Sequence, residues 1–372
     1  MNLVIQIITL QFSVDKYQKQ GIFIFSPNIK KNGDYRMGKL NINTVSDLLG
    51  LPKDQSLHEF ANIVIDGPDN KVFIDPVQIL SNQDSFSKDA QATIKDFFTH
   101  VTNILIQYPL NEVKLKSLFK YSSENNSTRL GTSRLILNNY SQGNGCTPDM
   151  LYKLFTQDNV IKLAKKGVFT ETPANVSLFV KGFDKDRMTD LISSLIFHLL
   201  VKFTDEQMKK GNKKVLQSPE PLEYMYWNHI EHSWEKDSYY PYLDFNKKPI
   251  VLLPKNILTG YYVYNAERYI RGHVLLAIQQ NVLKEAKMKD PKAKKQKLDN
   301  LEKDLRDKLG LKSTAYKDML IEYTLKQPNL DMLTDFKNQD KYSNMFSYTG
   351  RLTDQQLTTI IMKPYLSLSM TD

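Results

Sequence analysis

Apolar runs rich in β-branched and aromatic residues predict strands in the first part of the chain. The runs LVIQIITLQF (3–12) and GIFIFS (21–26) have this composition. In residues 62–76 (NIVIDGPDNKVFIDP), two short apolar runs flank a Gly-Pro-Asp-Asn turn signal. This pattern predicts a β-hairpin with Asp66 in the turn and Asp75 at its exit.

Apolar residues at helical spacing predict helices in much of the rest. One pattern runs from 88 to 120, and another helix is predicted to start at Thr147-Pro148-Asp149, where an N-cap residue precedes a proline and an acid. A stripe that follows Asp190 ends near Gly211. The remaining predicted elements are an irregular aromatic segment over 221–248, a buried strand over 248–257 that ends at Lys255, a helical hairpin with arms over 266–288 and 298–310, and a third helix that ends before Pro328.

Together these elements predict an α+β protein. We expect a mixed body over 1–265, a helical hairpin and a third helix over 266–330, and a C-terminal extension over 331–372 that packs on the body. The length of 372 residues and a hydrophobic content of 41% suit two domains, or one large domain with an appendage.

Cysteine usage and the apolar runs bear on the compartment. The single cysteine, Cys146, cannot form an internal disulfide and favours a reducing cytoplasm. The opening MNLVIQIITLQF lacks a basic region and a cleavage site, and no apolar run reaches transmembrane length. We therefore expect a cytoplasmic protein without a membrane partner.

Positive charge is concentrated in one short segment. The chain carries a net charge of +9, and residues 284–297 (KEAKMKDPKAKKQK) hold seven lysines against Glu285 and Asp290. More than half of the excess charge therefore lies in fourteen residues. Such a patch binds phosphate backbones by releasing counterions, although a solvated hairpin tip has the same composition. The predicted nucleic-acid-binding residues are Lys287, Lys289, Lys292, Lys294, Lys295 and Lys297, with Lys284 beside them.

Acids crowd the predicted helix start within FVKGFDKDRMTDLISSL (179–195). If the helix begins by residue 186, Asp186 and Asp190 share one face at i, i+4, with Arg187 beside them. Converging carboxylates with a nearby cation suit Mg²⁺ and phosphodiester chemistry, so Asp186 and Asp190 are the predicted metal ligands. The alternative is an ordinary helix start, with Asp186 or Thr189 as the N-cap and Asp190 as a first-turn acid.

Lys255, at the end of a predicted buried strand, is the expected catalytic partner of these acids. Restriction-type nucleases place an acid two residues before such a lysine, and here that position is Leu253. The acid would therefore come from elsewhere, and Asp75 and Glu124 are the candidates. We include Glu124 and Arg187 with Asp186, Asp190 and Lys255 in the predicted catalytic set.

The segment SQGNGCTPDM (141–150) places glycines directly before a helix start. Backbone N–H groups and the helix dipole there favour an anion, so Gly143, Gly145 and Thr147 form a candidate anion-binding loop. No Lys-Ser or Lys-Thr pair follows the glycines, so it is no Walker A loop. A plain loop-to-helix turn is the alternative.

Two histidine motifs have weaker signals. NHIEHSW (228–234) offers His229 and His232 as a metal pair if the segment is helical, or as half-buried residues among aromatic neighbours. ERYIRGH (267–273) resembles the arginine–histidine signature of helical HEPN ribonucleases, with Arg268 and His273 in the two positions. That resemblance implies metal-independent RNA cleavage by a dimer.

The segments SENNSTRLGTSR, GNG, DKDRMTD and PIVLLPK together resemble uncharacterised bacterial proteins found among mobile and phage-defence genes. The resemblance covers about residues 60–260. It implies intracellular defence with nucleic acid as the target, and it would carry over Glu124, Asp186, Arg187, Asp190 and Lys255. The sequence departs from the restriction-nuclease pattern at Leu253.

These observations lead to two main functional hypotheses. The first is a nucleic-acid-targeting hydrolase, namely a Mg²⁺-dependent nuclease or nuclease-like subunit of an anti-phage or restriction system. The second is a non-catalytic binding or assembly protein that recognises a protein or phage partner, or forms a homo-oligomer. A HEPN-like ribonuclease is a third option.

Overall fold

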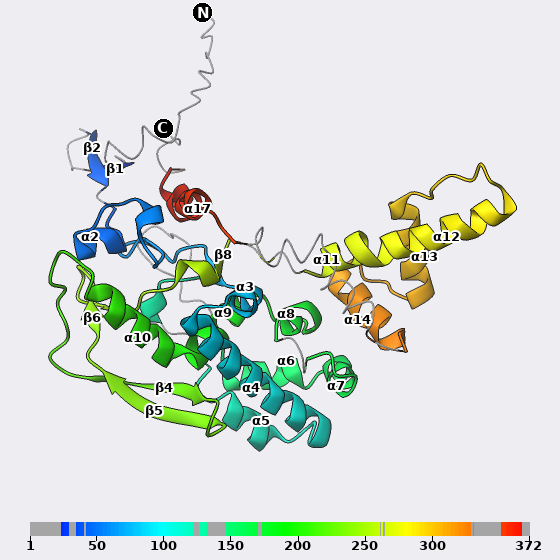
Figure 1. Cartoon of the computed structure of the whole chain (residues 1–372), viewed down its shortest axis with the longest axis horizontal. Coiled ribbons are helices and arrows are strands. Elements are labelled where there is room, and N and C mark those ends of the chain that lie inside the picture. Colours follow the sequence, from blue (N-terminus) through cyan, green and yellow to red (C-terminus); the bar gives the residue numbers. More distant parts are fainter. Residues whose placement is uncertain are drawn as a thin grey trace, which may run out of the picture.

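The computed structural model describes residues 24–29, 35–40, 42–122, 126–131, 146–169, 173–260, 262, 265–328, 330 and 351–366. The fold is α+β, as predicted: most elements are helices, and the strands form small antiparallel sheets (Figure 1). Each sheet described has two strands. The pairs are β1 (Ile24–Ile29) with β2 (Tyr35–Leu40), β3 (Phe73–Ile74) with β8 (Leu258–Thr259), β4 (Leu222–Asn228) with β5 (Ser233–Tyr239), and β6 (Tyr242–Leu243) with β7 (Pro249–Ile250). The predicted strand over 3–12 lies outside the described residues.

Two apolar segments that are distant in sequence meet at the centre of the body. The N–H of Ala61 donates to the carbonyl of Leu253 at 2.9 Å, and β3 pairs with β8 in register Phe73 to Thr259. All of these residues are buried. The hairpin predicted for 62–76 is therefore wrong, because β3 finds its partner near residue 258.

The predicted turn at 67–70 is closed by a side chain and not by strand pairing. The amide of Asn70 accepts from the N–H of Val64 at 3.1 Å and donates to the carbonyl of the same residue at 2.9 Å. Asp75 follows β3 as the N-cap of α3 (Pro76–Ser81). A polar side chain thus replaces the ladder hydrogen bonds that a hairpin would have supplied.

The buried strand predicted for 248–257 is only partly formed. Residues Ile250 to Leu253 are buried as expected, but β7 covers Pro249–Ile250 alone. Pro254 forms an isolated bridge with Phe60, and Lys255 opens the 3₁₀ helix η3 (Lys255–Ile257). Lys255 therefore lies at the start of a helical turn, directly after the residue that pairs with Phe60, and not at the end of a strand.

Helices surround this centre. In the body they are α2 (Val45–Leu49), the 3₁₀ turn η1 (Gln55–Leu57), α3, α4 (Ser85–Gln107), α5 (Glu112–Leu118), the 3₁₀ turn η2 (Asn126–Thr128), α6 (Pro148–Phe155), α7 (Asp158–Lys165), α8 (Asn175–Phe179), α9 (Lys185–Leu195) and α10 (Phe197–Met208). The helical pattern predicted over 88–120 is confirmed, and its apolar stripe is the buried face of α4. Because Pro109 cannot donate a helical hydrogen bond, the chain breaks after Gln107 and restarts as α5.

The aromatic segment predicted to be irregular over 221–248 is instead the regular β4–β5 hairpin. Trp227 and Trp234 lie opposite each other, with ring centroids 5.8 Å apart. The ring of Phe97 on α4 meets Trp227 edge to face at 5.1 Å. Tyr224 packs similarly against Phe197 of α10. These contacts fix the hairpin on the helices beside it (Figure 1).

A helical arm projects from the body, and it contains the predicted hairpin and third helix (Figure 1). It consists of α11 (Ala266–Tyr269), the π-helical turn η4 (Ile270–Val274), α12 (Leu275–Lys289), α13 (Leu298–Leu309) and α14 (Tyr316–Lys326). Gly310 caps α13 in the left-handed conformation, at φ 74°. In α12 only Leu275 and Gln279 are buried, so the end of this helix extends into solvent.

Near the C-terminal end of the chain, α17 (Asp354–Leu366) lies on the body and buries Leu357, Ile361 and Tyr365. It approaches two glycines closely. A Cβ atom on Gly67 would stand 1.8 Å from the hydroxyl oxygen of Tyr365, and one on Gly260 would stand 2.5 Å from Cδ1 of Ile360. A side chain at either glycine would therefore displace the side chain of α17 that packs on it.

Every helix in the described part of the chain is too short or too polar to cross a lipid bilayer.

Candidate functional site

The N-terminus of α9 is capped by Asp184, whose carboxylate accepts from the N–H of Arg187 at 3.1 Å. The predicted caps, Asp186 and Thr189, are therefore wrong. The guanidinium of Arg187 turns back to the carbonyl of Gly182 and to the carboxylate of Asp184. Much of the charge at this helix start thus satisfies the helix end itself.

Thr189 ties α9 to the central strand. Its hydroxyl accepts from the N–H of Ile74 at 3.0 Å and donates to the carbonyl of Lys185 at 2.8 Å. Both groups are buried. This contact explains why a polar residue lies within the helix. The buried N–H of Ile74 needs an acceptor, and the hydroxyl of Thr189 provides it.

The two predicted metal ligands lie in different surroundings. Asp190 is buried, with 9% of its surface exposed, and lies beside Cys146. The pKa of the Cys146 thiol is raised mainly by its own burial and, to a smaller extent, by the negative charge of Asp190. Asp186 lies towards Gly131: a Cβ atom there would stand 3.5 Å from both Asp186 Oδ1 and Asp69 Oδ2. The structure therefore brings Asp69, which the sequence did not single out, near Asp186. Asp69, Asp186 and Asp190 all have partners within the fold.

Lys255 is held by groups away from α9. Its ammonium donates to the carbonyl of Gln55 at 3.1 Å and to Asp354 of α17 at 2.8 Å. The lysine beside the α9 acids is Lys185, whose Nζ lies 4.0 Å from the ring centroid of Phe73 and 3.3 Å from the carbonyl of Gly260. Burial lowers the pKa of Lys185, and the nearby charges of Asp186 and Asp184 oppose that shift.

Asp75, the candidate acid at the exit of the predicted hairpin, is a buried helix cap. Its carboxylate accepts from the N–H of Val77 at 2.9 Å. Burial raises the pKa of Asp75 to about 7, and the hydrogen bonds from Val77 and Gln78 oppose the rise. The hydroxyl of Tyr262 donates to the carbonyl of Ile74 next to it. Asp75 is therefore buried between β3 and α3, where it caps the helix.

Part of the candidate anion-binding loop can be placed. Thr147 caps α6 and accepts from the N–H of Met150 at 3.2 Å, which confirms the predicted helix start. Asp149 in the first turn pairs with Lys116 of α5. Gly143 and Gly145, and likewise Glu124, lie outside the described residues.

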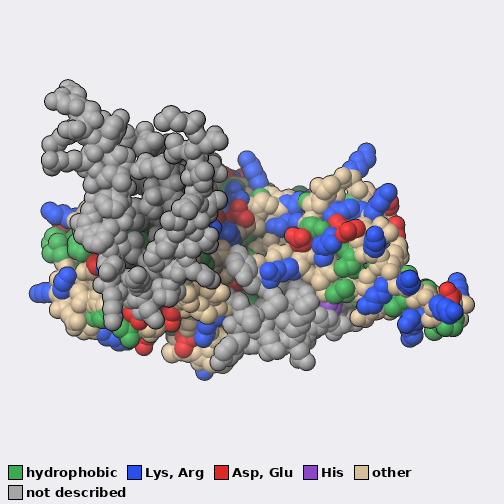
Figure 2. All heavy atoms as spheres, turned by 90° about the horizontal axis from the view of Figure 1, so that it is seen from above, with side chains coloured by type: hydrophobic (Ala, Val, Ile, Leu, Met, Phe, Trp, Pro, Cys, Tyr) green, Lys and Arg blue, Asp and Glu red, His purple; other side chains and the backbone are tan. Residues whose placement is uncertain are grey.

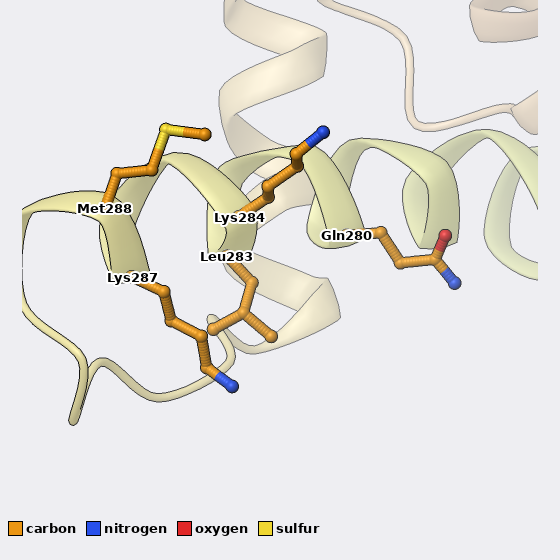
Figure 3. A pocket seen from close by; sticks show the side chains of 5 residues that line it. All are labelled: Gln280, Leu283, Lys284, Lys287 and Met288. Carbon is orange, nitrogen blue, oxygen red and sulfur yellow. The ribbon is translucent and has the colours of Figure 1, made fainter.

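The lysine-rich tip of the arm comprises residues 284–297, at the end of α12 and in the loop before α13. All seven of its lysines are exposed, and none of them takes part in an ion pair among the described residues. Basic side chains stand out at the end of the molecule where Figure 1 places the arm (Figure 2). Lys284 and Lys287 border a shallow depression with Gln280, Leu283 and Met288, all from one helix (Figure 3).

At the base of the arm, by contrast, basic groups are paired. Arg271 in the π-helical turn contacts Asp299 at 2.8 Å and Glu302 at 2.5 Å. Glu302 also binds Arg306 at 2.9 Å and accepts from the hydroxyl of Tyr316 at 3.0 Å. This network of ion pairs and hydrogen bonds joins the π-helical turn, α13 and α14. The helices that carry the lysine-rich tip are therefore held to one another at the base of the arm.

The arginine–histidine motif has its members in unlike surroundings. Arg268 is exposed on α11, whereas His273 is buried in the π-helical turn, with its ring 5.7 Å from that of Tyr269. Both have partners within the fold. The structure therefore does not present the two side chains together on an open surface.

The two histidines of NHIEHSW separate at the β4–β5 turn. His229 lies 3.3 Å from the hydroxyl of Thr93, and His232 lies 2.8 Å from Asp96 Oδ1. Because the segment is a hairpin turn and not a helix, the pair predicted to share a metal does not form. His232 instead joins residues of α4.

One protein family matches residues 50–265, more than half of the chain, and is described as a domain of unknown function, DUF8370. The chain belongs to the DUF8370 family. No curated protein matches it, and no solved structure does.

The DUF8370 segment divides the candidate residues. It contains the start of α9, Lys255 and the β4–β5 hairpin. It ends at residue 265, directly before α11, so the lysine-rich tip and α17 lie beyond it.

Proposed function

We propose that this protein binds nucleic acid and that the lysine-rich tip of the arm contacts the phosphate backbone. The observation that carries the proposal is the set of seven exposed lysines without ion pairs in the described structure, mounted on a projecting arm. Lysines in such a position neutralise phosphates and release counterions, and this supplies affinity without sequence specificity. The resemblance to phage-defence proteins supports a role for this binding in intracellular defence.

Two features favour an extended polyanion over a small phosphate ligand. The lysines are spread over the end of α12 and the loop that follows it, and only Lys284 and Lys287 border the shallow depression. The braced base of the arm limits its motion, which reduces the entropy lost when a long ligand binds.

Metal-dependent hydrolysis of the bound strand is the second candidate function. The approach of Asp69 and Asp186 to one point beside Gly131 supports it, with Lys185 nearby to offset developing negative charge. Carboxylate oxygens are the ligands that Mg²⁺ prefers, so these residues suit that ion. In this proposal Asp69 and Asp186 would hold Mg²⁺, and Lys185 would steady the phosphoryl oxygens. The bound ion would supply polarisation of the phosphate.

The decisive experiment compares two variants of the full chain that have the same net charge. The first replaces the seven lysines of residues 284–297 by glutamine. The control replaces seven exposed lysines of the body: Lys88, Lys95, Lys153, Lys162, Lys165, Lys214 and Lys248.

Binding of labelled single- and double-stranded DNA and RNA is then measured by fluorescence anisotropy. We expect the tip variant to bind about 100-fold more weakly at 0.1 M salt, and the control to stay within a fewfold of wild type. Equal losses in both variants would reduce the effect to net charge and overturn the assignment of the tip. Persistent capture of a protein partner without any nucleic-acid binding would favour the assembly hypothesis.

Cleavage is tested on the same substrates with Mg²⁺ or with a chelator. If the second candidate function holds, Asp186→Asn abolishes cutting, whereas Asp158→Asn, a first-turn acid of α7, leaves it unchanged. Cutting that survives Asp186→Asn would exclude the start of α9 as the metal centre.

A further inference from the structure

Three side chains that can ligate a metal converge where the β4–β5 turn meets α4. They are Asp96 and His100, one helical turn apart on α4, and His232 in the turn. The Nδ1 atom of His232 lies 2.8 Å from Asp96 Oδ1, and that of His100 lies 3.5 Å from the same oxygen. Each of the three residues offers one ligand atom within 4.8 Å of the other two.

We propose that Asp96, His100 and His232 bind one transition-metal ion of the Zn²⁺ class. In a tetrahedral zinc site with bonds of about 2.0–2.2 Å, ligand atoms stand roughly 3.3–3.5 Å apart. The two separations from Asp96 Oδ1, 2.8 and 3.5 Å, lie close to that value, so small side-chain rotations bring the three ligand atoms towards one ion. His100 would exchange its 3.0 Å contact with the main-chain oxygen of Asp96 for a bond to the ion.

The carboxylate of Asp96 is already oriented by a neighbour. The indole N–H of Trp227 donates to Asp96 Oδ2 at 2.7 Å and leaves Oδ1 directed at the histidines. Outer hydrogen bonds of this kind fix the orientation of a metal ligand and strengthen its binding. Trp227 is itself fully buried against Phe97, so the residue that orients Asp96 is packed in the hydrophobic core of the body.

His232 is held towards α4 by an uncommon backbone conformation. Its φ is 53°, in the left-handed region, where residues other than glycine are rare. The side chain of Asn228 accepts from the N–H groups of Ile230 and Glu231 and so shapes the same turn. As a result the His232 ring lies 5.0 Å from that of His100. Strain of this kind is retained where the surrounding structure fixes it, and here it serves the approach to the cluster.

The ligand set selects the kind of metal. Two imidazoles and one carboxylate suit Zn²⁺, Co²⁺ or Ni²⁺, whereas Mg²⁺ and Ca²⁺ prefer oxygen ligands. The side chains of Asp96, His100 and His232 are 16%, 35% and 56% exposed, so an ion can enter from solvent. Three protein ligands leave a fourth position for water. The ion would clamp the hairpin turn to α4.

The test uses the full chain after treatment with a chelator, titrated with Zn²⁺ by calorimetry. We expect one ion per chain in wild type and at least 100-fold weaker binding in His232→Ala and in His100→Ala. His229→Ala is the matched control, because His229 lies in the same turn but contacts Thr93. It should bind as wild type does.

Two further readouts keep the result interpretable. Both tryptophans of the chain, Trp227 and Trp234, are in this hairpin, so Co²⁺ should quench the intrinsic fluorescence of wild type and of His229→Ala alone. His232 is largely exposed, so its replacement should leave the fold of the metal-free protein unchanged, as judged by circular dichroism. Wild-type stoichiometry that survives in both His232→Ala and His100→Ala, or the lack of a one-to-one site in wild type, would overturn the proposal.

Discussion

At the start of α9, a dense group of charged and polar side chains is occupied by the fold: Asp184 caps the helix, Arg187 binds Gly182, and Thr189 satisfies β3. At the tip of the arm, lysines of similar density have no ion pair in the described structure. The two regions look alike in sequence, since both combine charge with a helix end. The difference teaches that charge which the fold does not use is the better sign of an external partner.

The largest expected effect separates the two regions by salt. If the tip neutralises several phosphates, the logarithm of the wild-type binding constant should fall against the logarithm of salt concentration with a slope of about −5. Replacing all seven lysines of the tip by glutamine should bring that slope to about −1. Asp184→Ala at α9 should leave it unchanged. A steep slope that persists without the tip lysines would place the polyanion contact elsewhere.

The next effect concerns Asp75, whose charge the fold suppresses. Its pKa is about 7 in the folded protein against 3.8 for the ordinary carboxyl, so the folded state binds the extra proton between these values. The stability contributed by the protonated form is therefore complete below pH 3.8 and is lost as the pH rises through 7. Asp75→Asn keeps a cap but cannot titrate.

We expect the stability of Asp75→Asn relative to wild type to grow by about 2–4 kcal/mol between pH 4 and pH 8, as measured by urea unfolding. Asp84→Asn, which alters the exposed cap of α4, serves as the control. Parallel pH profiles for wild type and Asp75→Asn would mean that Asp75 is ionised in the folded protein, and it would regain interest as a metal ligand.

A smaller effect is expected at Thr189. Thr189→Val leaves the buried N–H of Ile74 without an acceptor and should lower the free energy of unfolding by about 1–3 kcal/mol. Thr102→Val is the matched control, because Thr102 is also buried and its hydroxyl bonds the helix backbone of Phe98. The structural interpretation of Thr189 fails if urea midpoints fall equally in both variants.

The smallest effect is the cap of α9. Asp184→Ala should cost about 1 kcal/mol of stability, while Asp184→Asn should cost little because asparagine caps equally well. Thermal unfolding of the two variants measures the difference. A larger loss of nucleic-acid affinity than of stability in Asp184→Ala would show that this helix start does contact the ligand.

Local patterns in the sequence predicted the helices of this fold well. Leu301, Leu305 and Leu309 recur at helical spacing up to Gly310, and the structure forms α13 over this stripe. Thr147 likewise capped the predicted helix. Such signals lie within one or two turns of chain, so a sequence contains them completely.

The strands were predicted poorly because their determinants are distant or two-sided. The partner of Phe73 is Thr259, which no local pattern indicates. In β4, Tyr224 packs on Phe197 while Trp227 packs on Phe97, so both faces are apolar and the usual alternation is missing. The sequence indicates only part of the cluster at α4. Asp96 and His100 are four residues apart on one helix, but His232 comes from the β4–β5 turn, and no local pattern connects it to them.

The seating of α17 on Gly67 and Gly260 has a practical consequence for recombinant work. A shortened protein restricted to residues 50–265 would keep the whole DUF8370 segment and yet lack Tyr365, Ile360 and Asp354. The two glycines would then face open space, and the ammonium of Lys255 would lose its carboxylate. Family boundaries are thus a poor guide to where this chain can be cut, and soluble expression should improve when α17 is retained.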